Sequence, residues 1–379
     1  MAMAKGLGWE INGHALATLR PLGGWVVAGL LTEAKPRSLR TMSLLYATHQ
    51  RFLEHDTGTG HPERPARLEA VERGIDAAGL RDALVPVSPV VASDADIARI
   101  HPETYTAALA EFCDAGGGHL DGDTHVGTES WVAATLAAGA GLEVIRRLDA
   151  GEGSVGFCAV RPPGHHALAS RAIGFCLLNN VAVAAASLAA RGERVAIVDY
   201  DAHHGNGTQE LFWSDPRVFY ASMHEWPTFP GTGRLDDVGA GDGVGTTLNL
   251  PFPAGTTGDV YRAGLDDVLM PTLEAWGPTW LLISAGFDAH YRDPLTDLGL
   301  TAGDYADLTS TLSRLVPGGR RLLFLEGGYD LEALSNCTGS VLSALIDDGA
   351  YRPEGTSSGG PGAEVNVAAL KIRKSLADR

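Results

Sequence analysis

A run of acidic and imidazole side chains has the types and spacing of a catalytic metal site. Asp199, Asp201 and His203 stand two residues apart after an apolar segment, so in an extended chain all three leave the same face. Asp288 follows a second apolar segment. Two carboxylates and one imidazole suit Zn²⁺ and leave coordination positions open for water and substrate. Because neither motif contains a Lys or Arg, a metal ion explains these acids better than a buried ion-pair cluster.

A histidine pair and a tyrosine could complete a hydrolytic site. His165 and His166 follow a rigid Pro-Pro-Gly turn, and two imidazoles beside an activated water supply a general base and a general acid. Tyr329 follows Gly327-Gly328, a flexible hinge from which a phenol could donate to a developing oxyanion. On the residues alone, a structural histidine pair and an ordinary core or rim tyrosine remain open alternatives.

Each of these side chains follows an apolar segment suited to a buried strand. The segments that we expect as strands are Ser154–Val160, Val195–Tyr200, Val218–Met223, Trp280–Ser284 and Leu322–Leu325. Those with helical spacing are Ser130–Leu148, Asn180–Ala190, Asp259–Trp276, Ala302–Leu315 and Leu331–Ile346. This alternation predicts a single α/β domain with an open, mainly parallel sheet flanked by helices on both faces. Ligand sites in such sheets lie beyond the carboxyl ends of the strands, where the reactive residues fall.

The ends of the chain are predicted to lie outside that domain. Residues 1–41 are interpreted as an N-terminal extension, since a signal-peptide pattern around Leu22–Leu31 is poorly formed. The catalytic domain is expected over residues 42–350, beginning with a strand at Ser43–Ala47. Residues 351–379 are expected to be a polar C-terminal tail, entered through a flexible Gly- and Ser-rich linker at Glu354–Pro361.

Composition excludes some partners and favours others. The formal charge of −17 over 379 residues argues against broad contact with nucleic acid and would attract a cationic substrate. No segment is apolar for long enough to span a bilayer, so no membrane partner is expected. The four cysteines show no CxxC spacing and no disulfide framework, which favours a reducing, cytoplasmic setting. The oligomeric state stays open, a homo-oligomer included.

Five motifs, taken in order along the chain, resemble the histone deacetylase family. They are Pro162–His166, Asp199–Gly207, Phe229–Gly233, Ser284–Asp288 and Glu326–Tyr329. That family includes the acetylpolyamine amidohydrolases and has the arginase-type α/β fold. The resemblance runs from about Tyr46, through His61–Arg67, to about Leu345. Asn206 and the sequence around Asp288 are similar to the class II and bacterial branch.

The resemblance implies two kinds of bound metal. One catalytic Zn²⁺ would be held by Asp201, His203 and Asp288. Structural K⁺ would be held, partly through backbone oxygens, at a first site comprising Asp199, Asp201, His203, Ser222 and Met223. A second K⁺ site, less securely matched, would comprise Phe212, Asp215 and Val218.

The resemblance also implies roles for the reactive side chains. His166 would be the general base that takes a proton from the attacking water. His165, oriented by Asp199, would stabilise charge in the transition state. Asn206 falls where the partner of His166 is expected, and its neutral amide should hold a cationic imidazole less strongly than a carboxylate. Tyr329 would polarise the acyl carbonyl together with the zinc.

A narrow acyl tunnel is expected around these groups, with Phe175 and Phe229 as apolar walls. The residues that we expect to bind substrate are Phe175, Phe229, Leu295, Gly174, Gly327 and Asp123. Leu295 resembles the ordinary apolar pocket residue of the family, and Asp123 resembles a rim aspartate that grips the substrate backbone. Together these indicate a zinc-dependent amidohydrolase that removes an acyl group from acylated lysine.

Three alternatives compete with this assignment. An acidic rim of Asp121, Asp123 and Glu129 could instead favour an acetylated polyamine. An arginase-like hydrolase with two manganese ions would need further carboxylates, yet Gly205 and Gly286 stand where these could have bridged. A non-catalytic acyl-binding relative would be expected to lack a ligand or the tyrosine, whereas the full set is present.

Overall fold

The computed structural model describes residues 43–346 and 349–378. The extension expected over residues 1–41 lies outside these described residues. The described residues belong to one compact unit, which joins the predicted catalytic domain and the segment after residue 350. Among the described helices, none combines the length and the apolar character needed to cross a membrane.

One sheet of eight strands forms the centre of the fold. Its strands are β1 (Leu44–Ala47), β2 (Leu84–Val87), β5 (Val155–Cys158), β6 (Val195–Asp199), β7 (Val218–Glu225), β8 (Thr247–Phe252), β9 (Trp280–Ala285) and β10 (Arg321–Leu325). They lie in the order β2-β1-β5-β10-β9-β6-β7-β8, and every neighbouring pair is parallel. The parallel sheet predicted from the sequence is therefore confirmed. The five strands predicted to deliver reactive residues are adjacent at its centre, so their carboxyl ends meet.

The two edge strands were not predicted, and both contain proline. Pro86 lies in β2 and Pro251 in β8. Proline cannot donate to a strand ladder, so it argues against a central strand but is tolerated at an edge. A separate antiparallel pair, β3 (Gly118–His119) and β4 (His125–Val126), was also missed because each strand is only two residues long.

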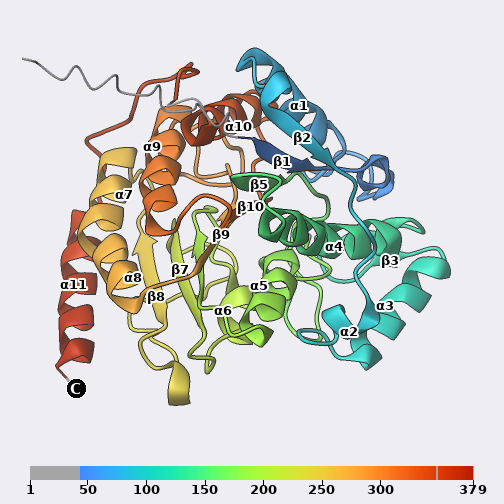
Figure 1. Ribbon diagram of the computed structural model, residues 1–379, viewed down its shortest axis with the longest axis horizontal. Helices are drawn as coiled ribbons and strands as arrows, with labels where there is room; N and C mark the ends of the chain where they lie inside the picture. The colour runs from blue at the N-terminus through green and yellow to red at the C-terminus, as the bar shows by residue number, and fades with distance from the viewer. Residues whose placement is uncertain (1–42, 347–348, 379) are drawn as a thin grey trace, which may run out of the picture. The chain divides into compact units, whose positions relative to one another are not determined.

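Helices cover both faces of the sheet (Figure 1). They are α1 (Ala66–Ala77), α2 (Asp94–Ile97), α3 (Glu103–Asp114), α4 (Ser130–Asp149), α5 (Asn180–Ala190), α6 (Asn206–Leu211), α7 (Gly258–Gly264), α8 (Met270–Trp276), α9 (Ala302–Leu312), α10 (Leu331–Ile346) and α11 (Ala363–Ala377). Helices α1, α10 and α9 pack together on one side, while α4 and α5 pack on the other. Small residues let α4 approach the sheet closely. At Gly141 of that helix, a Cβ would lie 2.5 Å from the Phe324 ring of β10.

The long helix predicted over Asp259–Trp276 is interrupted. It consists of α7, a π-helical turn at Leu265–Leu269 and α8, which has Pro271 in its first turn. Proline has no N–H to continue the α-helical ladder, and a π-turn is one way of accommodating such a break. By contrast, α5 and α10 have the predicted bounds.

The C-terminal segment is not a tail, and the expectation of a flexible linker at Glu354–Pro361 was wrong. Glu354 accepts hydrogen bonds from His290 at 2.9 Å and from the Ala302 N–H at 2.7 Å. Ser357 donates to the buried Asp304 at 2.7 Å. Beyond them α11 packs on α7 and β8. Composition alone gave a linker because the residues that hold the segment are distant in sequence.

Candidate metal centre and active site

Asp201, His203 and Asp288 converge at the carboxyl ends of β6 and β9. One ligand atom from each lies within 4.8 Å of the others, and all three residues are buried. Nδ1 of His203 lies 3.2 Å from Oδ1 of Asp201 and 3.1 Å from Oδ2 of Asp288. Strands β6 and β9 are neighbours, which is why residues so far apart in the sequence meet here.

Backbone amides fix both carboxylates. Oδ1 of Asp201 accepts the His203 N–H at 2.9 Å, while its Oδ2 accepts the Gly327 N–H at 2.8 Å. Oδ1 of Asp288 accepts the Ala202 N–H at 2.7 Å. These bonds hold the two carboxylates in place beside His203. The carboxylates are therefore already ordered in the folded protein before a metal binds.

The donor set fits a metal ion such as Zn²⁺. Among the described residues, Asp201 and Asp288 pair with imidazoles but with no Lys or Arg. Burial and the neighbouring Asp201 carboxylate both raise the pKa of Asp288, as expected for acids crowded together without a cation. Imidazole nitrogen and carboxylate oxygen are both zinc ligands, and three protein donors around one point leave a position open, as a catalytic zinc site requires.

The two adjacent histidines have different partners. His165 shares a hydrogen bond between Nδ1 and Oδ2 of Asp199 at 2.9 Å, whereas Nδ1 of His166 lies 2.8 Å from Oδ1 of Asn206. The ring centroids of the pair are 4.0 Å apart. With Nδ1 occupied, the Nε2 atom of each ring is the one available to a substrate or water.

The surroundings of the two imidazoles favour opposite charge states. Although burial lowers the pKa of His165, Asp199 and Asp201 raise it more strongly, to about 10. Burial lowers the pKa of His166 well below its ordinary value, and the neighbouring His165 and His203 lower it further. His165 is therefore suited to the cationic form and His166 to the neutral form that can accept a proton.

Tyr329 lies at the same site and is held from two sides. Its ring packs edge-on against Phe175 at 5.8 Å, and the buried Arg67 guanidinium lies 5.0 Å from the ring centroid. Arg67 also donates to the Gly328 carbonyl at 2.8 Å. No role was predicted for Arg67, because the contacts that join it to this loop are with backbone carbonyls more than 250 residues away along the chain.

A cavity of about 750 Å³ leads to these groups, with His166, His203 and Tyr329 among its lining residues. Of the predicted substrate-binding residues, those that line it are Gly174, Phe175, Phe229, Leu295 and Asp123. Gly327 is not among the residues that line the cavity. It lies behind the metal ligands, where a Cβ would collide with the Asp288 and Asp201 carboxylates.

Residues 61–345 match the histone deacetylase domain. The chain belongs to the histone deacetylase family. A probable deacetylase of Archaeoglobus fulgidus is 36% identical over 81% of this chain and 89% of that protein. A histone deacetylase-like amidohydrolase of Pseudomonas aeruginosa is 32% identical over 89% of this chain and 83% of that protein. The crystal structure of the HDA15 HD domain is 34% identical with a TM-score of 0.81, covering 89% of this chain and 97% of that one.

In this histone deacetylase family member, part of the cavity wall is a tight turn at Gly174 and Phe175. Ile173 and Cys176 exchange backbone hydrogen bonds of 3.2 and 3.1 Å around Gly174 and Phe175. Both central residues have positive φ, 57° and 67°, as in a tight type I′ hairpin turn. Gly174 is required because a Cβ there would lie 2.6 Å from the His166 ring.

Another part of the wall comes from the loop at residues 57–62, which was not predicted to contribute, and from the β3–β4 hairpin, which carries the predicted rim residue Asp123. His61 connects them, with Nε2 lying 2.9 Å from the Asp123 carbonyl, and its ring packs edge-on against Phe175 at 4.6 Å. Of the predicted acidic rim, Asp123 lines the cavity, while Glu129 pairs with Arg51 at 2.9 Å. Asp121 accepts two backbone N–H bonds within its own turn.

The predicted potassium ligands fall in two separate places. Ser222 of β7 pairs in register with Asp199 of β6, next to the metal cluster, and Met223 follows it. Phe212, Asp215 and Val218 surround a turn in which the Asp215 carboxylate binds Arg217 at 2.6 Å. Any cation at this turn would therefore rely on backbone oxygens.

Glycines close the positions where a second catalytic metal would need ligands. A Cβ at Gly205 would collide with Asp199, and one at Gly286 would collide with Asp201. Neither position can carry a carboxylate without moving the buried acids. The glycines therefore allow the ligand strands to pack this closely.

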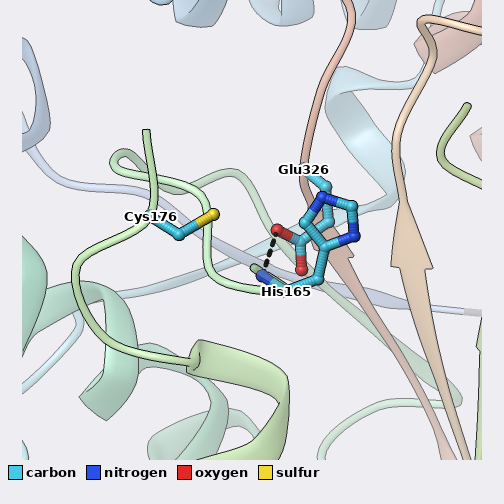
Figure 2. A group of neighbouring side chains, drawn as sticks. All are labelled: His165, Cys176 and Glu326. Carbon is cyan, nitrogen blue, oxygen red and sulfur yellow. Dashed lines mark hydrogen bonds between the residues drawn. The ribbon is translucent and has the colours of Figure 1, made fainter. Parts of the chain in front are cut away.

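Glu326 is a residue of the site for which the sequence suggested no role. Its Oε2 accepts the Gly164 N–H at 2.7 Å and the His165 N–H at 3.1 Å, and its Oε1 accepts from Ser284 at 3.1 Å. Figure 2 shows this carboxylate beside His165 and Cys176. Since both oxygens are already engaged, this trio is a support for the histidine turn rather than a second metal site.

Proposed function

We propose that this protein is a zinc-dependent deacylase that hydrolyses the amide of an acylated lysine side chain. The observation that carries the proposal is the grouping of Asp201, His203 and Asp288 with two oppositely tuned histidines at a cavity. Membership of the histone deacetylase family supports hydrolysis of an acylated substrate. The shape of the cavity and its lining support the choice of substrate.

Asp201, His203 and Asp288 would hold the Zn²⁺, which when bound supplies Lewis-acid polarisation of the carbonyl and lowers the pKa of water. Nε2 of neutral His166 accepts a proton from the attacking water, while Asn206 holds the other ring nitrogen. His165, kept cationic by Asp199, stabilises negative charge as it develops and can supply a proton to the leaving amine. The Tyr329 hydroxyl donates to the carbonyl oxygen, most strongly when that oxygen becomes an oxyanion.

The cavity favours a lysine side chain over a polyamine. An acyl-lysine presents an alkyl chain to Phe175, Phe229 and Leu295, whereas a polyamine brings further ammonium groups. Asp123 is the one carboxylate among the described residues lining the cavity. Because Glu129 is paired with Arg51 and Asp121 is used in its own turn, little acidic charge remains to bind a second ammonium. Burying an unpaired cation against apolar walls is costly.

Substrate choice is tested by kinetics on acetyl-lysine peptides, longer acyl-lysine peptides and acetylated polyamines with one preparation. We expect the acetyl-lysine peptide to have the highest kcat/KM. Leu295→Glu should move the ratio toward acetylated polyamines, while Leu295→Gln, of similar size but neutral, should not. A tenfold preference of the wild type for an acetylated polyamine would instead support the acetylpolyamine amidohydrolase alternative.

The metal is tested separately. Active protein should contain about one zinc per chain, as three donors around one point imply. Removal by a chelator should abolish turnover, and added Zn²⁺ should restore it. Two tightly bound manganese ions that restore more activity than zinc would support the arginase-like alternative.

Two further assignments belong to this proposal. Structural K⁺ at the Asp199–Ser222–Met223 site would neutralise acids behind the metal cluster, and it predicts that K⁺ raises the unfolding temperature more than Na⁺ does. The cytoplasm is proposed as the setting, supported by four buried cysteines that are all free. Fractionation of the cells that produce the protein tests this location.

A further inference from the structure

The loop that carries Tyr329 joins β10 to α10 and is fixed by side chains from elsewhere. Gly328 in this loop has φ of 116°, which leaves the chain free to turn just before the tyrosine. The Gly327 N–H binds Asp201, and Arg67 binds the Gly328 carbonyl. The Tyr329 N–H itself donates to Oδ2 of Asp293 at 2.7 Å.

Asp293 lies in the loop between β9 and α9 and is only 6% exposed. Its Oδ2 also lies 3.4 Å from the Asp330 N–H, at the start of α10. Its Oδ1 accepts the Leu295 N–H at 3.0 Å. One buried carboxylate thus joins the backbone of the catalytic tyrosine to the backbone of the apolar pocket residue.

We propose that Asp293 is a positioning residue that sets the Tyr329 hydroxyl relative to the substrate pocket. This inference rests on the proposed function, in which Tyr329 donates to the reacting carbonyl. Tyr329 and Leu295 both line the cavity. Because one carboxylate holds the backbone of both residues, it fixes the position of the Tyr329 hydroxyl relative to the part of the pocket that binds the substrate side chain. A displacement on the scale of 1 Å is enough to reduce turnover strongly.

Asparagine separates this role from simple packing. Asp293→Asn has nearly the same size, but it offers one carbonyl oxygen where the aspartate offers two acceptors. Its NH₂ group must face either the Tyr329 N–H or the Leu295 N–H, so one loop loses its acceptor. The exposed Asp297 lies on the same loop, and Asp297→Asn is therefore the matched control.

The test is a double-mutant cycle measured on zinc-loaded full-length enzyme with an acyl-lysine peptide. Asp293→Asn should lower kcat on the order of tenfold or more and change KM less. In a Tyr329→Phe background the same substitution should change kcat by no more than about twofold, because the hydroxyl it positions is already absent. An equal loss in both backgrounds would overturn the proposal. If Asp293→Asn does not fold, Asp293→Glu enters the same cycle with the same criteria.

Hydrogen exchange provides a readout that does not depend on turnover. The amide of Tyr329 should exchange faster in Asp293→Asn than in the wild type, and Asp297→Asn should leave it unchanged. Unchanged exchange in Asp293→Asn would refute the positioning role even if activity fell. If the wild type hydrolyses no acylated substrate, the proposed function fails, while the exchange measurement still decides whether Asp293 holds Tyr329.

Discussion

His165 and His166 are adjacent in the sequence yet are prepared for different tasks. The carboxylate of Asp199 holds one ring as a cation, and the amide of Asn206 holds the other without adding charge. His165 is therefore disfavoured as the proton acceptor, and His166 as the proton donor. Asp199 is 34 residues from His165 in the sequence, and Asn206 is 40 residues from His166. The difference between the two rings therefore depends on partners that only the fold brings near.

Tyr329→Phe tests the third reactive side chain. The change removes only the hydroxyl, so the ring contacts with Phe175 and Arg67 should survive. Turnover should fall on the order of a hundredfold, as for other lost oxyanion donors. Metal analysis and thermal unfolding of the same protein serve as controls. Near-normal turnover would remove Tyr329 from the mechanism.

At the residue scale, motif spacing predicted the groups that face the cavity but not those that support them. Asp201, His203 and Asp288 could be found because their side chains carry the chemistry and follow recognisable strands. Glu326, Asp293 and Arg67 could not be assigned, since they support the site mainly through backbone amides and carbonyls that only the folded chain brings near. A buried acid in a loop, such as Asp293, has no local pattern that distinguishes it from a turn residue.

At the scale of elements, the central strands were predictable and the edges were not. Continuous apolar runs identify β5, β6, β7, β9 and β10, which are buried on both faces. Strands β2 and β8 carry proline and lie at the two edges of the sheet. A sequence pattern cannot show that a segment is an edge, where this proline is allowed.

Helix α11 is expected to contribute to stability. It places Asn366 and Ala369 in buried positions, and Arg373 donates to the Gly245 carbonyl at 2.9 Å. A chain ending at Gly362 should lose at least about 2 kcal/mol of unfolding free energy, equivalent to exposing one or two buried apolar side chains. Urea titration measures this, with Val367→Ala on the exposed face as the control. An unchanged midpoint would show that the helix adds nothing to the fold.

At the scale of the whole molecule, a buried ion network connects the start of the domain to its end. Glu63 binds both Arg161 and Arg67, and all three side chains are fully buried. Arg161 also donates to the Phe52 carbonyl at 2.8 Å, while Arg67 binds the loop of Tyr329. Although burial raises the pKa of Glu63, Arg161 lowers it overall to about 2, so this acid stays charged over the usual range.

His55 next to this network predicts acid sensitivity. Burial lowers its pKa to about 4, although the Glu63 carboxylate, 3.7 Å from Nε2, opposes this and Arg161 adds to it. The unfolded chain therefore binds a proton from about pH 6.5 downward, while the folded protein does so only near pH 4. The free energy of unfolding should therefore decrease as the pH is lowered across that window. The total decrease from this residue should be on the order of 3 kcal/mol.

The measurement compares urea unfolding at several pH values between 7 and 4 for the wild type and His55→Gln. The variant cannot titrate, so its stability should depend less on pH. His119→Gln, at an exposed histidine of β3, should follow the wild type. Parallel pH dependence of all three proteins would contradict the assignment.

Phe175 lines the cavity from a backbone conformation that is unfavourable for an aromatic residue. An aromatic residue in the left-handed region, at φ of 67°, is strained by about 1 kcal/mol or more. Replacing it with Ala keeps that strain, whereas Gly relieves it. Phe175→Gly should therefore be more stable than Phe175→Ala by about 1 kcal/mol, the reverse of the usual order. Both variants should bind substrate poorly. That result would mean that the locally unfavourable backbone is retained because it places the aromatic ring in the cavity wall.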